Sequence, residues 1–163
     1  SKEALFNVLN NHFSFEGLKI LDLFAGTGNI SYEFASRGST PITSVDGDFG
    51  CVKFIKQVAT EYDFNIAATK SDVFTYLERC KTSYDIIFAD PPYCKGPADR
   101  DFIVELAEAG VAGLLKGGGV FIAEVQEGWG TGREGAAEID GLNLVDTRRY
   151  GKNMLLFYQL PEK

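Results

Sequence analysis

The 163-residue sequence has no apolar run near the ~20 residues that a membrane-spanning helix needs. Its N-terminus also lacks the basic, apolar and small-residue regions of a signal peptide. It holds three cysteines (Cys51, Cys80 and Cys94) and a single histidine, His12. An odd cysteine count without C-x-x-C spacing indicates neither a disulfide framework nor a zinc site. We therefore expect a cytoplasmic protein that contacts no membrane and carries no metal.

Positive charge is also scarce, because 16 Lys and Arg stand against 23 Asp and Glu and the formal net charge is −7. This balance argues against a protein that coats nucleic acid by bulk attraction. It leaves room for a local basic patch. The candidate patch is Arg148, Arg149 and Lys152, which could contact RNA phosphates or could only solvate an edge strand.

The hydrophobic content of 45% is enough for one domain, residues 1–163, with one substantial core, and we expect a monomer. Short apolar runs alternate with stretches whose apolar residues repeat at helical spacing. Strands are predicted over 18–24, 42–45, 64–68, 84–89, 120–125, 142–147 and 154–160. Helices are predicted over 4–9, from 30 to a stop at Gly38, and over 52–62, 73–80 and 103–114, the last ending before Gly117 to Gly119.

Repeated strand–helix units imply right-handed crossovers and a mostly parallel sheet. The last third holds three strands without a long helix between the final two, which indicates an antiparallel hairpin at one edge. The predicted fold class is therefore α/β. It is a doubly wound, Rossmann-like, mostly parallel seven-stranded sheet with helices on both faces and an antiparallel C-terminal hairpin.

The segment from Asp22 to Asn29 lies where the first strand becomes a helix, and it contains Gly26-Thr27-Gly28. Glycines let the backbone turn tightly and let a ligand approach closely. In open α/β sheets this edge binds the ligand, although an ordinary turn would look the same. Asp46, 20 residues beyond Gly26, is placed to accept hydrogen bonds from ribose hydroxyls. Asp72 could line an adenine pocket or cap a helix.

Two cofactors compete for this loop. The dinucleotide fingerprint calls for a third glycine where the chain has Ser31. S-adenosylmethionine has no pyrophosphate, so it does not need a crowded glycine cradle at a helix N-terminus. The loop therefore favours S-adenosylmethionine over NAD.

Asp90-Pro91-Pro92-Tyr93 follows the fourth predicted strand and is the most specific short string in the chain. An exocyclic amine of a nucleobase is a poor nucleophile because its lone pair is delocalised into the ring. The Asp90 carboxylate and the Pro91 carbonyl could accept its two N–H groups, and the prolines fix φ and remove local donors. Tyr93 could stack on an unstacked base. A rigid loop exit is the alternative interpretation.

These residues resemble class I methyltransferases, and more narrowly the bacterial RsmD-type enzymes that methylate N2 of a guanine in small-subunit ribosomal RNA. The similarity spans nearly the whole chain. It is carried by residues 2–9, the loop from Asp22 to Gly28, the segment from Asp90 to Tyr93, and Tyr150-Gly151-Lys152 before a strand.

The resemblance implies a methyl transfer from S-adenosylmethionine to N2 of the guanine at nucleotide 966 of 16S rRNA, within a small-subunit assembly particle. The implied catalytic residues are Asp90, Pro91, Pro92 and Tyr93. The implied cofactor-binding residues are Asp22, Phe24, Ala25, Gly26, Thr27, Gly28, Asn29, Asp46, Gly47, Ser71, Asp72, Val73 and Asp90. The family carries a basic segment before the opening helix that is absent here, so we expect weak binding to free RNA.

Three alternatives share parts of this pattern. Adenine N6 in DNA or RNA and the amide of a protein glutamine each present a planar NH₂ that the same turn could hold. A nucleic-acid-binding module without catalysis would need no cofactor loop.

We predict that S-adenosylmethionine or S-adenosylhomocysteine raises the melting temperature of this chain, because a ligand that binds the native state stabilises it. NAD should leave the melting temperature unchanged. A thermal-shift titration with both ligand classes tests this prediction, and a shift with NAD alone would overturn the cofactor assignment.

Overall fold

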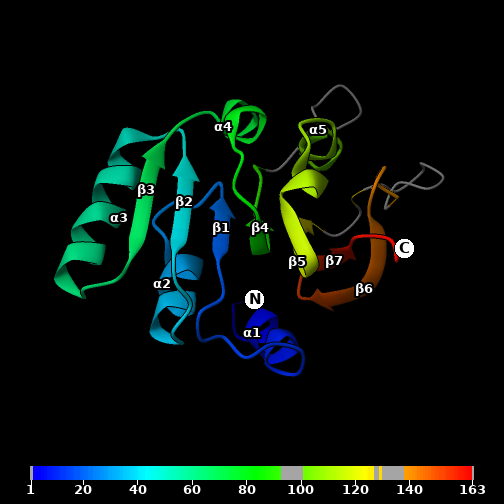
Figure 1. The fold of residues 1–163 in the computed structure, drawn as a ribbon, viewed down its shortest axis with the longest axis horizontal. Helices are drawn as coiled ribbons and strands as arrows, with labels where there is room; N and C mark the ends of the chain where they lie inside the picture. The colour runs from blue at the N-terminus through cyan, green and yellow to red at the C-terminus, as the bar shows by residue number, and fades with distance from the viewer. Residues whose placement is uncertain (1, 93–100, 127–128, 130–137, 163) are drawn as a thin grey trace.

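The computed structural model describes residues 2–92, 101–126, 129 and 138–162, and a seven-stranded sheet forms its centre (Figure 1). The strand order is β3-β2-β1-β4-β5-β7-β6. The first five strands along this order are parallel, and β7 pairs antiparallel with both β5 and β6. The predicted fold class, including the C-terminal hairpin, is confirmed. The strands are β1 (Ile20–Leu23), β2 (Ile42–Asp46), β3 (Ile66–Lys70), β4 (Tyr84–Ala89), β5 (Leu115–Gln126), β6 (Asn143–Tyr150) and β7 (Asn153–Gln159).

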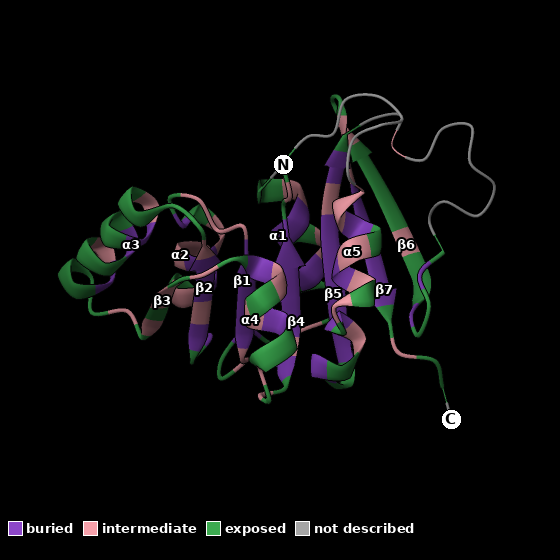
Figure 2. Ribbon diagram, turned by 90° about the horizontal axis from the view of Figure 1, so that it is seen from above, coloured by how far each residue is buried: buried purple, intermediate pink, exposed green. Residues whose placement is uncertain are grey.

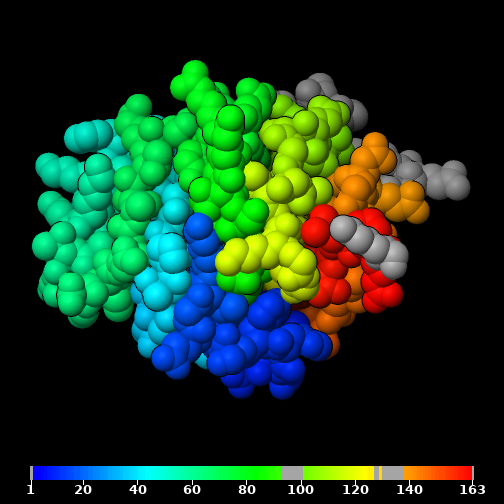
Figure 3. All heavy atoms as spheres, in the orientation of Figure 1, coloured from blue at the N-terminus to red at the C-terminus, as the bar shows by residue number. Residues whose placement is uncertain are grey.

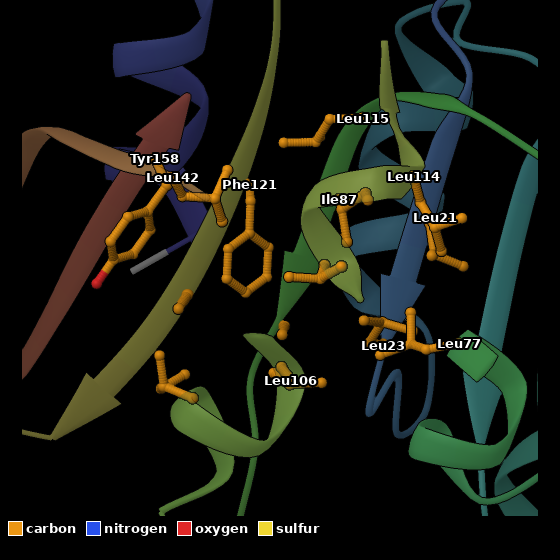
Figure 4. Close-up of a cluster of buried hydrophobic side chains, with 14 of the residues drawn as sticks. Leu21, Leu23, Leu77, Ile87, Leu106, Leu114, Leu115, Phe121, Leu142 and Tyr158 are labelled. Carbon is orange, nitrogen blue, oxygen red and sulfur yellow. The ribbon is translucent and has the colours of Figure 1, made fainter. Parts of the chain in front are cut away.

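Side chains alternate between the two faces of the sheet, and each face has its own core. On one face Leu21, Ile87 and Phe121 pack against α4 and α5, as Figure 4 shows. On the other face Ile20, Ile86 and similar neighbours pack against α1 and α2. Figure 2 shows the central strands buried and β6, at the sheet edge, largely exposed. The helices are α1 (Lys2–Asn10), α2 (Asn29–Ser36), α3 (Phe49–Glu61), α4 (Val73–Arg79), α5 (Phe102–Glu108) and the 3₁₀ turn η1 (Val111–Leu114).

The N-terminal helix packs beside the C-terminal strands. Leu5, Phe6 and Leu9 of α1 are each 1% exposed and share a cluster with Leu155 and Phe157 of β7. Figure 3 shows the dark-blue N-terminal segment beside the orange-red C-terminal strands on the surface of the molecule. None of the helices in the described residues is long and apolar enough to cross a membrane.

The third strand begins two residues later than predicted, at Ile66. The reason is the end of α3, where Asp63 takes a left-handed φ of 55° and the Phe64 N–H donates to the Ala59 carbonyl at 2.9 Å. This closure satisfies a terminal helix carbonyl, as in a Schellman motif. Phe64 therefore belongs to the helix cap and is not part of the strand.

The single helix predicted over 103–114 is wrong. Gly110 takes a left-handed φ of 96°, which ends the α-helical stretch and starts η1. The glycine triplet also lies inside β5, not between elements. There the β4–β5 pairing shifts register between Tyr84 and Ile86. At this shift the backbone of β4 lies so close to β5 that one position of β5 has no room for a side chain.

That position is Gly119, because an added Cβ would lie 2.8 Å from the Asp85 carbonyl oxygen and 2.9 Å from that of Lys116. Both are backbone atoms and cannot rotate away. We expect Gly119→Ala to lower the free energy of unfolding by roughly 1–3 kcal/mol, as overpacking does. Urea denaturation measures this. Gly117→Ala is the matched control, since its Cβ would meet nothing within 4 Å; equal effects of the two substitutions would contradict the close-approach argument.

Candidate active site

The glycine loop between β1 and α2 is shaped by three left-handed residues. Phe24, Gly26 and Gly28 have φ angles of 56°, 57° and 91°. An added Cβ at Gly28 would lie 2.7 Å from the end of the Tyr32 side chain, and its left-handed φ of 91° also favours glycine. An added Cβ at Gly26 would meet nothing within 4 Å. Gly26 therefore faces open space, where a ligand can approach the backbone.

Asp46, at the end of β2, holds this loop. Its Oδ2 accepts a hydrogen bond from the Gly26 N–H at 2.9 Å, and its Oδ1 accepts one from the Asp48 N–H at 2.8 Å. A carboxylate has about four acceptor sites, so these bonds leave capacity for ribose hydroxyls. The sequence placed Asp46 at this edge, and the structure adds its second task of anchoring the loop.

The turn after β3 lies against the same edge. The Ser71 N–H donates to the Asp46 carbonyl at 3.0 Å, which brings this turn beside Gly47. Asp72 caps α4, because its Oδ2 accepts from the Thr75 N–H at 2.9 Å. The predicted helix cap by Asp72 is confirmed, and its role beside an adenine stays a prediction. The Val73 side chain is 3% exposed and packs in the core.

Asp22 carries the one buried carboxyl group in the described structure. It is 1% exposed at the end of β1 and accepts a hydrogen bond from Ser31 Oγ at 2.7 Å. Ser31 Oγ also lies 2.6 Å from Ser44 Oγ of β2. The pKa of Asp22 is raised to about 7, mainly by burial, with a smaller contribution from the negative charges of Asp90 and Asp46 and against the lowering effect of the Ser31 hydrogen bonds. A buried acid with this pKa is poised to receive a cation.

Sequence analysis missed the roles of Ser31 and Ser44. Ser31 was interpreted only as the residue that replaces the third glycine of the dinucleotide fingerprint. Ser44 was notable only as a polar residue in an apolar strand. The only available clue was that Ser44 and Asp46 lie on the same face of β2.

The Asp90-Pro91-Pro92 turn follows β4 directly and so lies at the same carboxyl edge. Asp90 is accessible to solvent, yet partial burial together with the charge of Glu124 raises its pKa to about 6. Its charge also acts on Asp22. The predicted cofactor loop and the predicted amine clamp are therefore neighbours. Tyr93 and Cys94 lie outside the described residues.

The aromatic rings of Phe24, Phe74 and Phe102 pack together beside the glycine loop. Phe24 lies 5.8 Å from Phe102 and 6.2 Å from Phe74, both edge-on, and Phe74 stacks on Phe102 at 6.1 Å. They come from the end of β1, the start of α4 and the start of α5. Phe24 therefore joins an aromatic wall next to the glycine loop.

The basic residues of β6 do not form one patch. Arg148 pairs in register with Leu155, and Arg149 pairs with Met154. Neighbouring strand residues point to opposite faces, so the two guanidinium groups are separated by the sheet. Arg148 is also paired with Asp146 at 3.0 Å. The backbone of β6 thus directs Arg148 and Arg149 to opposite faces of this edge strand, and the predicted contact of Arg148, Arg149 and Lys152 with RNA stays a prediction.

No group of three or more His, Cys, Asp or Glu residues within the described ranges could hold a metal ion. Three of the predicted cofactor residues lie together at one loop: the buried acid Asp22, the open backbone of Gly26 and the partly exposed carboxylate of Asp46.

A solved structure shares this whole arrangement of strands and helices. It is RsmC of Thermus thermophilus, a 16S rRNA N2 methyltransferase in complex with AdoMet and guanosine, and it covers 98% of this chain and 43% of its own, with a TM-score of 0.77 and 23% identity. The fold is that of the class I S-adenosylmethionine-dependent methyltransferases. Within that class, the chain belongs to the family described as Conserved hypothetical protein 95, which matches residues 1–159. This membership confirms the resemblance to RsmD-type enzymes.

Two curated relatives are named for different RNA substrates. Ribosomal RNA small subunit methyltransferase D of Buchnera aphidicola is 29% identical over 93 residues, which are 56% of this chain and 47% of that protein. A tRNA1(Val) (adenine(37)-N6)-methyltransferase of Erwinia tasmaniensis is 30% identical over 84 residues, 46% of this chain and 32% of that protein. The chain therefore spans about half or less of these relatives.

The raised pKa of Asp22 predicts how stability depends on pH. The folded-state value of about 7 lies above the ordinary 3.8, so the folded protein holds this proton more tightly than the unfolded chain. The resulting stabilisation is complete below pH ~4 and is lost as the pH rises through 7. Asp22→Asn should remove this loss, making the variant more stable than the parent at pH 8 by up to about 4 kcal/mol.

The measurement is urea unfolding of the ligand-free protein and of Asp22→Asn at pH 4.5, 6 and 8. Titrating groups that do not interact with Asp22 cancel in the difference between the two proteins. If the two stability curves ran parallel across this range, Asp22 would not titrate as described.

Proposed function

We propose that this chain transfers a methyl group from S-adenosylmethionine to the exocyclic N2 of a guanine in 16S rRNA, with a small-subunit assembly particle as the substrate. The observation that carries the proposal is that the Asp90-Pro91-Pro92 turn lies next to the Asp22 loop at one sheet edge. The family membership and the relative named for small-subunit ribosomal RNA support an RNA substrate.

The cofactor supplies an electrophilic methyl group on a positively charged sulfur. Asp22 is suited to the cationic amino group of its methionine part, and Asp46 to its ribose hydroxyls. Ser71 to Val73 are proposed to line the adenine edge, mostly through backbone atoms, since Val73 is buried. Gly26 lets the ligand approach the loop without a side chain in the way.

Asp90 and the Pro91 carbonyl are proposed to accept the two hydrogens of the target amine. This holds the nitrogen with its lone pair toward the methyl group, and oriented approach is a large source of acceleration. When the new C–N bond forms and the C–S bond breaks, the nitrogen must lose a proton. Asp90, with a pKa of about 6, can take that proton and release it near neutral pH. Tyr93 is proposed to stack on the base.

The second candidate is methylation of adenine N6, and one observation favours it. The relative from Erwinia tasmaniensis is named for that reaction. Mass spectrometry of nucleosides from methylated ribosomal particles separates the two products, since N2-methylguanosine and N6-methyladenosine differ in mass.

We expect Asp90→Ala to reduce single-turnover methyl transfer by roughly 100- to 10,000-fold, because it removes the acceptor for the amine. The affinity for S-adenosylhomocysteine should stay within a few-fold. Asp90→Asn should keep the amine contact but lose the proton acceptor, and should fall between the parent and Asp90→Ala. The substrate is ribosomal particles from a strain that lacks the enzyme. A near-normal rate for Asp90→Ala on particles that the parent methylates would refute the clamp mechanism.

A further inference from the structure

A second carboxylate lies beside the amine clamp. In the parallel β4–β5 pair Ala89 is opposite Ala123, so Asp90 and Glu124 are the next residues on the two neighbouring strands (Figure 1). Glu124 is only partly exposed, and its charge is close enough to raise the pKa of Asp90. A ligand group that binds Asp90 would therefore also lie close to Glu124.

The C-terminal hairpin positions Glu124. Asn153 Nδ2 donates to Glu124 Oε2 at 3.3 Å, and Asn153 pairs in register with Tyr150 of β6. Glu124 lies two residues from Ile122, and Asn153 lies two residues from Leu155, so each pair shares one sheet face. Ile122 and Leu155 belong to the core that α1 covers, and Tyr150 packs against the same core. Tyr150 Oη is buried, and no hydrogen bond to it is found among the described residues. The hairpin thus presents polar groups toward the end of β5.

Guanine, adenine, cytosine and a protein amide differ in the atom next to the NH₂ group. In guanine the C2 amine lies beside the ring N1–H, which is a donor. In adenine and cytosine the neighbouring ring nitrogen is an acceptor, and in an amide the neighbour is the carbonyl oxygen. A carboxylate is an acceptor only, so it attracts the guanine edge and repels the lone pair of the other three.

We propose that Glu124 is a specificity-determining residue that accepts the N1–H of the target guanine while Asp90 holds the adjacent N2 amine. Asn153 is a positioning residue for this carboxylate. The inference rests on the proposed function, and it assigns the choice of guanine over adenine to the C-terminal hairpin. A carboxylate can accept about four hydrogen bonds, so the bond from Asn153 is compatible with this role.

The experiment compares two bases at the position that the parent enzyme methylates. The substrate is a small-subunit particle assembled with synthetic 16S rRNA that carries either guanine or 2-aminopurine there. 2-Aminopurine keeps the C2 amine but has an unprotonated N1. The parent should prefer guanine in kcat/KM. Glu124→Gln presents a donor to N1, so the guanine to 2-aminopurine ratio should fall roughly 10- to 100-fold, the effect of one hydrogen bond to a charged group. The change in the ratio cancels the intrinsic reactivity of each base.

Glu108→Gln removes the same charge from an exposed position on α5 and should leave the ratio unchanged. Glu124→Asp is the second variant. It should lower kcat/KM for guanine while guanine stays preferred, and a normal melting temperature establishes that each variant folds.

The outcomes separate the two proposals. If the parent methylates no guanine, the proposed function is wrong. If the parent methylates guanine but folded Glu124→Gln keeps the parent's ratio, Glu124 does not read N1–H and this inference is wrong while the proposed function stands. If Glu124→Gln does not fold and Glu124→Asp leaves kcat/KM for guanine unchanged, the inference is overturned as well.

Discussion

The hydrogen-bonded chain from Asp22 through Ser31 to Ser44 is the interaction on which the site depends. It joins the end of β1, the first turn of α2 and β2, and it does so inside the core, where Asp22 is 1% exposed. Burying a carboxyl group is costly unless it is neutral, hydrogen-bonded or paired. Asp22 is hydrogen-bonded to Ser31, and its raised pKa means that burial also favours its neutral form. A bound cation would relieve that cost, which supports the proposal that the loop holds the cationic part of S-adenosylmethionine.

The same edge carries a row of acids across four strands. Asp46 of β2, Asp22 of β1, Asp90 directly after β4 and Glu124 of β5 lie in the spatial order of these strands in the sheet. The charges of Asp90 and Asp46 contribute to the raised pKa of Asp22, and the charge of Glu124 contributes to the raised pKa of Asp90. Such a row suits ligands that present positive charge or N–H donors. On the proposals made above, one end of the row serves the cofactor and the other serves the donor-rich edge of guanine.

Much of the fold follows from patterns that are local in the chain. The bounds of β4 were predicted correctly because six residues in a row are apolar or half-buried, as a central parallel strand requires. The position of the glycine loop and of Asp90 at the ends of strands followed in the same way. Local patterns failed where two neighbouring elements compete for one segment. Phe64 closes α3 and does not enter β3, and Gly110 splits the helix over 103–114.

The sequence by itself determined which residues lie at the carboxyl edge, since strand ends and turn residues are set by short-range periodicity and by φ. Only the tertiary structure decided which of those ends are neighbours. Ser44 meets Ser31, Glu124 stands beside Asp90, and Arg148 faces away from Arg149, because parallel and antiparallel registers are chosen by packing between strands that are distant in the chain. A one-residue change of register would turn each of these side chains to the other face. That choice depends on the whole core, and no single segment encodes it.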